Sequence, residues 1–208
     1  MKNFYIFDLD GTLIDSKSMI SNCFKKVLNE LLPNNSHKTD NLLIGPSLHD
    51  TAGKLLGNNN QHLIGKFKEK FIEIHDNHLL KEIKMFDYAE DLLSQLYSQG
   101  NALMIATNKR IEPTNIIIDQ FGWRKYFIDI FSANEFIKKE DGIRQVLEKN
   151  SKFKEMYLVG DTLSDGIAAN KLNIKFIKAL YGYGKDENWS EIDVFMEIES
   201  LREVIVSK

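Results

Sequence analysis

The side chains best suited to chemistry are carboxylates gathered in two short patterns. Asp8 and Asp10 lie in the first, which reads Asp8-Leu9-Asp10-Gly11-Thr12, and Asp161 and Asp165 form the second. Carboxylates brought to one place repel each other unless a cation compensates them. Mg²⁺ prefers hard oxygen ligands, and proteins hold it with one or two carboxylates plus phosphate oxygens of the substrate. These residue types therefore indicate a magnesium and phosphate site, provided that the fold brings the two patterns together.

Each pattern follows a short apolar run that is typical of a buried parallel strand. Phe4–Phe7 precedes Asp8, and Met156–Val159 precedes Gly160 and Asp161. A third such run, Ala102–Ala106, ends in Thr107. In open parallel sheets, ligands bind at the carboxyl ends of the strands. We therefore expect these polar residues to meet at one edge of a sheet.

Strands and helices alternate along the second part of the chain. The apolar spacing predicts helices at Tyr88–Gln99, Pro113–Phe121, Asp141–Lys149 and Leu163–Leu172, further strands at Ile128–Ser132 and Ile174–Ala179, and a short closing unit near Val194–Val206. Alternation of this kind implies an α/β fold, in which a parallel sheet carries helices on both faces.

The stretch between the first strand and this alternating part is predicted to be all-helical. Apolar residues recur at helical spacing over Lys17–Leu32, Leu48–Leu56 and Gln61–Leu80, and no strand pattern occurs between Asp15 and about Lys84. We therefore expect a helical domain at residues 16–84, inserted into a core that comprises residues 1–15 and 85–208.

Composition excludes several classes of protein. The chain has 208 residues, of which 43% are hydrophobic and 27% charged, and its formal net charge is -3. Such a chain can bury a core, and it has no basic excess for nucleic acid or an anionic membrane surface. Its one cysteine, Cys23, cannot form an internal disulfide, and we expect it to be a small core residue. With no signal-peptide pattern and no apolar run of roughly 18 residues, a cytoplasmic location is expected.

Taken in order, the motifs resemble those of a known superfamily. The Asp8–Thr12 pattern, Thr107 at a strand end, a downstream lysine, and Asp161 with Asp165 are similar to the haloacid-dehalogenase-like superfamily of phosphotransferases. Within it, the chain looks like the phosphoglycolate phosphatase and 5′-nucleotidase branch, whose helical cap is inserted after the first motif. The resemblance covers nearly the whole chain, with Gly45-Pro46-Ser47-Leu48 and Tyr181-Gly182-Tyr183-Gly184 as supporting matches.

The resemblance implies a Rossmann-like core with an inserted helical cap, and a Mg²⁺-dependent phosphatase that acts on a small phosphorylated metabolite. Asp8 would be the nucleophile that forms an aspartyl-phosphate. Asp10 would protonate the leaving alcohol and then deprotonate the attacking water. The metal would be held by the side chains of Asp8 and Asp161 and the carbonyl of Asp10, with Asp165 holding a metal-bound water or supporting the lysine. The phosphoryl oxygens would be bound by a further group of residues: Leu9, Gly11, Thr12, Thr107, Asn108 and Lys139.

Two positions depart from the family pattern. The proline that commonly follows the phosphate-site lysine is missing, and Lys138 and Lys139 are adjacent. Lys139 fits the spacing of the following apolar residues, with Lys138 as the alternative. Phe86-Asp87-Tyr88 stands where relatives usually have a Pro-Gly turn between cap and core. Hinges for cap opening are expected near Asp15–Lys17 and Ile83–Asp87.

Other interpretations remain open for individual residues. Asp161 and Asp165 taken alone could cap the following helix, and a strand-end Thr107 could simply bond to the backbone. His75 and His78 could share a metal, but their polar surroundings favour a solvated helix face.

At the level of function, a phosphomutase of the same fold and a non-catalytic binding or regulatory protein are the alternatives. Phosphoglycolate, nucleoside monophosphates and sugar phosphates all remain open as substrates. No nucleic-acid or membrane partner is expected, and the oligomeric state is undetermined.

Overall fold

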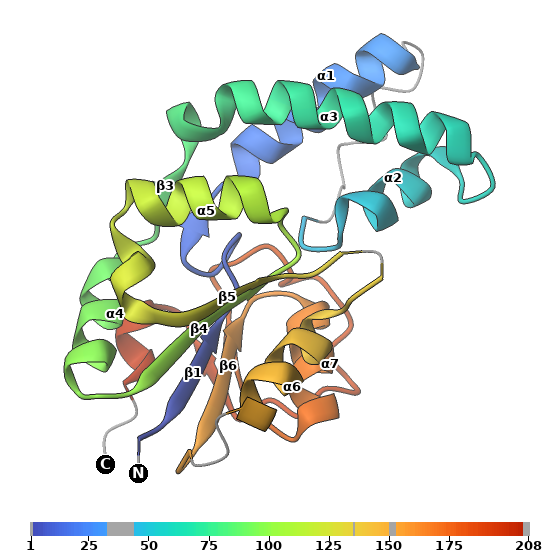
Figure 1. Cartoon of the computed structure of the whole chain (residues 1–208). Helices are drawn as coiled ribbons and strands as arrows, with labels where there is room; N and C mark the ends of the chain where they lie inside the picture. The colour runs from blue at the N-terminus through green and yellow to red at the C-terminus, as the bar shows by residue number, and fades with distance from the viewer. Residues whose placement is uncertain (1, 33–43, 135, 150–152, 206–208) are drawn as a thin grey trace.

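The computed structural model describes residues 2–32, 44–134, 136–149 and 153–205. Six strands in this part of the chain form one parallel sheet, in the order β5-β4-β1-β6-β7-β8 (Figure 1). Their bounds are β1 Phe4–Phe7, β4 Ala102–Thr107, β5 Phe127–Ser132, β6 Met156–Gly160, β7 Lys175–Ala179 and β8 Met196–Ile198. The strand ends differ from the expected ones by a residue or so.

Both faces of the sheet are covered, because its strands alternate apolar side chains between two clusters. In β1, Tyr5 and Phe7 belong to one cluster, and Phe4 and Ile6 to the other. Helices α4 (Ala89–Ser98) and α5 (Ile111–Gln120) and the short 3₁₀ helix η3 (Leu201–Val204) pack on the first face; α6 (Lys139–Lys149) and α7 (Leu163–Leu172) pack on the second. A further 3₁₀ helix, η2 (Trp123–Tyr126), precedes β5. The α/β prediction is confirmed.

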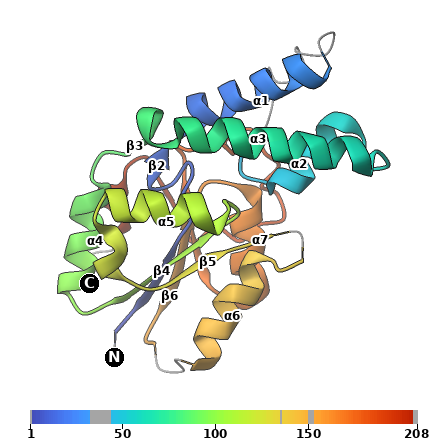
Figure 2. The same cartoon turned by 45° about the horizontal axis from the view of Figure 1, so that its top comes forward.

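The helices expected at residues 16–84 lie together beyond the carboxyl end of the sheet (Figure 2). They are α1 (Lys17–Leu31), α2 (Leu48–Leu56) and α3 (Gln61–Glu82), and we call residues 16–84 the insert. Helix α3 packs along α1, where the Phe24 ring stacks on Phe67 and is tilted against Phe71, with ring centroids 5.8 and 4.6 Å apart. Cys23 is buried in the same layer, as expected for a small core residue.

Two short strands join the insert to the sheet domain. β2 (Ile14–Asp15) pairs antiparallel with β3 (Lys84–Met85), so both connections run side by side at the expected hinge positions. At the departure from the Pro-Gly pattern, Tyr88 adopts φ 67°, the left-handed region that favours glycine. The Arg202 guanidinium lies over the Tyr88 ring, 3.5 Å from its centroid, and holds this residue against the C-terminal segment.

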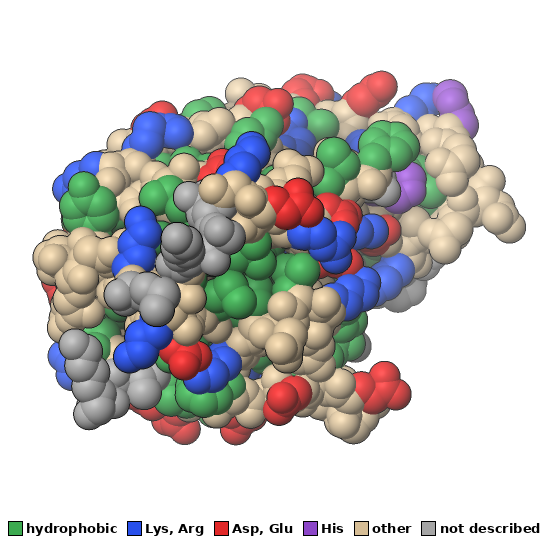
Figure 3. All heavy atoms as spheres, turned by 60° about the horizontal axis from the view of Figure 1, so that its bottom comes forward, with side chains coloured by type: hydrophobic (Ala, Val, Ile, Leu, Met, Phe, Trp, Pro, Cys, Tyr) green, Lys and Arg blue, Asp and Glu red, His purple; other side chains and the backbone are tan. Residues whose placement is uncertain are grey.

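The surface carries charges of both signs. On the face shown in Figure 3, basic and acidic side chains of the described residues are interspersed, in keeping with a formal net charge of -3. Among the described residues, none of the helices is both long and apolar enough to span a bilayer.

Candidate active site

The sheet brings the two acidic patterns together at its carboxyl edge. β1 lies between β4 and β6, and Phe7 is in register with Ile105 and Val159. Asp8 is therefore level with Gly160, and Asp161 follows one residue further along the neighbouring strand. Ligand oxygens of Asp8, Asp161 and Asp165 all lie within 4.8 Å of one another, and these three residues are at most 5% exposed.

A single lysine reaches this cluster from the start of α6. Lys139 Nζ lies 2.7 Å from Asp8 Oδ1 and 2.5 Å from Asp165 Oδ1, and the residue is 4% exposed. Lys138 is exposed on the surface. Of the two lysines considered from the sequence, the structure thus brings Lys139 into the site.

Burial and crowding of like charges dominate the electrostatics of the cluster. Burial raises the pKa of Asp8 to about 7, although the Lys139 charge acts against this rise. Burial and the charges of Asp8 and Asp165 raise the pKa of Asp161 well above its usual value. Burial by itself would lower the pKa of Lys139, but the carboxylates of Asp165 and Asp8 raise it overall. When all three are ionised, these buried carboxylates exceed the charge of the one ammonium, so their hard oxygens fit a divalent cation such as Mg²⁺ that would compensate them.

Glycines make room for the Asp161 carboxylate. A Cβ built on Gly11, whose φ is 90°, or on Gly182 would overlap the Asp161 side chain. The carboxylate is held by Thr12 Oγ1, which donates to Oδ1 at 3.3 Å, and by the Tyr183 N–H, which donates to Oδ2 at 2.5 Å. The Thr12 side chain therefore orients Asp161. The Leu9 side chain is buried in the core, so Leu9 could contact a phosphate only through its backbone.

Asp165 both caps helix α7 and belongs to the acidic cluster at the strand ends. Its Oδ2 accepts hydrogen bonds from the Thr162 N–H at 3.0 Å and from Thr162 Oγ1 at 2.8 Å, at the start of α7. Its Oδ1 accepts from Lys139. Since both oxygens already have partners, Asp165 is placed to position Lys139 and the loop before α7.

The residues at the end of β4 lie on the other side of Asp8. Thr107 is buried, and its Oγ1 accepts a hydrogen bond from the Lys109 N–H at 3.1 Å. The Asn108 side chain donates to the Gly45 carbonyl of the insert at 2.7 Å and to Ser164 Oγ at 3.2 Å. Asn108 thus ties the insert to the sheet domain, a contact that the sequence did not suggest.

Asp10 is engaged by two residues that sequence reasoning missed. Ser16 Oγ donates to Asp10 Oδ1 at 2.6 Å, and Lys109 Nζ lies 3.1 and 3.2 Å from the two carboxylate oxygens. Lys109 directly follows Thr107 and Asn108. A basic residue so close to the strand end could have identified Lys109 as a site residue from the sequence. Asp10 itself lies at the boundary between the sheet domain and the insert.

The expectation of a solvated face for His75 is wrong. His75 is 4% exposed and stacks on Phe71, with ring centroids 5.4 Å apart. Its Nδ1 lies 2.9 Å from Asp76 Oδ1, and its Nε2 lies 3.4 Å from Lys109 Nζ. Burial, together with the Lys109 charge, lowers the pKa of His75 to about 4, so the ring is neutral near pH 7. The apolar spacing predicted the helix α3, but it did not show that the face of α3 that carries His75 lies opposite the ends of the sheet strands.

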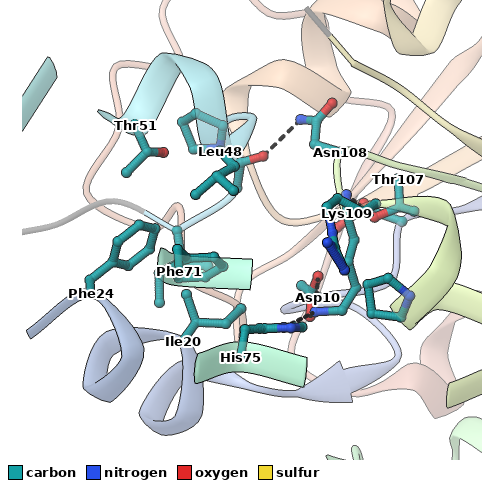
Figure 4. A pocket seen from close by; sticks show the side chains of 16 residues that line it. Asp10, Ile20, Phe24, Leu48, Thr51, Phe71, His75, Thr107, Asn108 and Lys109 are labelled. Carbon is teal, nitrogen blue, oxygen red and sulfur yellow. Dashed lines mark hydrogen bonds and ion pairs between the residues drawn. The ribbon is translucent and has the colours of Figure 1, made fainter. Parts of the chain in front are cut away.

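A cavity of about 80 Å³, partly open to solvent, lies between the insert and these strand ends. Figure 4 shows Asp10, Thr107, Asn108 and Lys109 on one side of it and side chains of α1, α2 and α3 on the other. Arg110, at the start of α5, closes one flank, where its Nη2 lies 3.0 and 2.7 Å from the two oxygens of Asp76 on α3.

Comparisons with known proteins agree with this arrangement. The model of the haloacid dehalogenase-like hydrolase family matches residues 5–179. A phosphoglycolate phosphatase from Aquifex aeolicus is 30% identical over 86% of this chain and 85% of its own length. The pyrophosphatase PpaX of Bacillus cereus is 28% identical over 83% and 81%. A haloacid dehalogenase-like family hydrolase from Streptococcus pneumoniae superposes with a TM-score of 0.84, at 25% identity, covering 98% of this chain and 96% of that one.

Proposed function

Because the chain belongs to the haloacid dehalogenase-like hydrolase family and is a phosphatase, we propose that it hydrolyses a small phosphomonoester through an aspartyl-phosphate on Asp8, with Mg²⁺ as cofactor. One observation carries this proposal. Lys139 and the carboxylates of Asp161 and Asp165 surround Asp8 in a buried site at the strand ends, beside Asp10. Such a site combines a nucleophile with the charges that phosphoryl transfer requires.

In the first step, an Asp8 carboxylate oxygen attacks phosphorus, a bond forms between them, and the bond from phosphorus to the leaving oxygen breaks. Asp10, in its protonated form, gives the leaving oxygen its proton. Lys139 holds Asp8 Oδ1 and leaves Oδ2 available for the attack. We expect the backbone N–H groups of Leu9 and Asp10 and of the end of β4 to bind the phosphoryl oxygens. The Gly11 and Thr12 N–H groups already donate to the carbonyls of Ile14 and Leu9.

In the second step, water attacks the aspartyl-phosphate, Asp10 takes the proton of that water, and Asp8 is released. Lys109 and Ser16 hold Asp10 in place for both transfers. Asp8, Asp161 and the Asp10 carbonyl would hold Mg²⁺, which supplies charge neutralisation when bound. We propose that the insert, residues 16–84, acts as a cap that keeps bulk solvent away from the site during the first step.

Phosphate release from a panel of phosphorylated metabolites tests this proposal. Wild type is expected to release phosphate with Mg²⁺ and to lose activity with a chelator. Asp8→Asn should be inactive, whereas Asp91→Asn, an exposed position on α4, should retain full activity. No release from any compound by the metal-loaded wild type would contradict the proposal. Movement of phosphate between two positions of a sugar, without release, would identify a phosphomutase.

A further inference from the structure

The wall that the insert presents to the catalytic residues is mostly apolar. Ile20 and Phe24 of α1, Leu48 of α2 and Phe71 of α3 line the cavity opposite Asp10 (Figure 4). Ile44 and Pro46 of the insert add to this lining, as does Pro113 of α5 outside the insert. A phosphate bound at Asp8 would direct its leaving group into this space. The side chains of this wall are therefore the ones that contact the leaving group.

The side chains of this wall pack closely against one another. Phe24 and Phe71 lie 4.6 Å apart between ring centroids, and Phe71 in turn stacks on His75. Phe24, Phe71 and Ile20 are each at most 8% exposed. A preformed apolar wall favours an apolar group on entropic grounds, because few side chains need to be ordered on binding.

The cations that line the cavity already have partners. Among the described lining residues, the basic side chains are Lys109 and Arg110. Lys109 contacts both oxygens of Asp10, and Arg110 contacts both oxygens of Asp76. His75 is neutral, as described above, and Thr51 offers a hydroxyl. A second negative charge on the substrate would thus compete with Asp10 and Asp76 for these two cations, beside a mostly apolar wall.

We propose that the natural leaving group is uncharged and carries an apolar or aromatic body that contacts Phe24, Leu48 and Phe71. This inference rests on the proposed phosphatase reaction and narrows its substrate class. The named relatives are a phosphoglycolate phosphatase and a pyrophosphatase, whose names indicate a leaving group with a carboxylate or a second phosphate. The wall of this chain selects against both.

A pair of isosteric substrates tests the inference. Isopentyl phosphate and the phosphate ester of β-hydroxypropanoate have leaving groups of the same shape, but one ends in two methyl groups and the other in a carboxylate. Each buried methyl or methylene contributes a factor of about four. We therefore expect kcat/KM of the metal-loaded wild type to be at least about tenfold higher for isopentyl phosphate.

A charge placed on the wall should change this preference. Leu48→Lys brings an ammonium to the cavity, and the ratio of the two kcat/KM values should shift by at least about tenfold towards the carboxylate ester. Leu56→Lys is the matched control, because Leu56 is also a half-buried leucine of α2 but does not line the cavity. The control should keep the wild-type ratio, and thermal denaturation of both variants verifies folding.

The outcomes separate the two proposals. Equal or better turnover of the carboxylate ester by wild type would overturn the apolar leaving group while leaving the phosphatase reaction intact. An unchanged ratio in folded Leu48→Lys would overturn the placement of the leaving group against this wall. Absence of phosphate release from either ester and from the whole metabolite panel would overturn the proposed reaction and this inference with it.

Discussion

The buried Asp8 carboxylate should make the stability of the metal-free protein depend on pH. The pKa of Asp8 is about 7 in the folded protein, against 3.8 ordinarily. A raised carboxyl pKa stabilises the folded state fully below about pH 4, and this contribution is lost as the pH rises through about 7. At 1.36 kcal/mol per pKa unit, the difference between the folded and the ordinary pKa of Asp8 corresponds to about 4 kcal/mol of folding free energy.

Roughly 2–3 kcal/mol of this contribution is lost between about pH 5 and pH 8. Other groups titrate in the same range. Burial lowers the pKa of His75 to about 4, so its stabilising contribution is lost as the pH falls from its usual 6.5 through about 4, in the opposite direction. Both proteins carry His75, so its titration cancels in the difference between wild type and Asp8→Asn. That difference reports Asp8 together with its effect on Asp161, whose pKa the Asp8 charge raises.

Urea unfolding of chelator-treated protein across this pH range measures the difference. Asp8→Asn should gain about 2–3 kcal/mol over wild type between pH 5 and pH 8, because it removes the charge that burial disfavours. Asp91→Asn, on the exposed face of α4, should show a difference that does not vary with pH. A wild-type and Asp8→Asn difference that stays constant within about 0.5 kcal/mol would refute the reasoning.

Three further predictions concern the residues around Asp8. Gly182→Ala should displace the Asp161 carboxylate and weaken Mg²⁺ binding, measured by calorimetry, by about tenfold or more. Gly65→Ala is the control, because a Cβ at this position of α3 meets no other atom, and it should leave Mg²⁺ binding unchanged. Lys109→Met removes the cation from Asp10 and should lower kcat by about a hundredfold; steady-state kinetics with kcat within threefold of wild type would contradict this role. The pair of Arg110 and Asp76 is partly exposed, so a double-mutant cycle in urea unfolding should give a coupling below about 1 kcal/mol, and a larger value would show that this contact holds the insert closed.

The sequence predicted best the parts of the fold that repeat a local pattern. The buried runs at Phe4–Phe7 and Ala102–Ala106 are apolar throughout, and α7 begins and ends where its apolar spacing predicts. The carboxylates of Asp8 and Asp161 follow such strands, so a shared edge of a parallel sheet was enough to place them together.

Contacts between distant segments were beyond local patterns. In the sequence, His75 is followed by the polar residues Asp76, Asn77 and His78, and its burial depends on α3 lying over the strand ends. Tyr183 and Gly182 bind and accommodate Asp161 from a loop after β7, a proximity that only the tertiary fold reveals. The roles of Asp8, Asp10 and Lys139 in the reaction remain predictions that the geometry supports.

The central claim is that Asp8 carries the phosphoryl group during turnover. Rapid quenching of the Mg²⁺-loaded enzyme with a good substrate, followed by borohydride reduction and peptide mass mapping, tests it most directly, because borohydride converts an aspartyl-phosphate into an alcohol. The account predicts a reduced side chain at position 8, formed only when both substrate and Mg²⁺ are present. Reduction at Asp10 or Asp161, or active turnover with no reducible acyl phosphate at position 8, would contradict it.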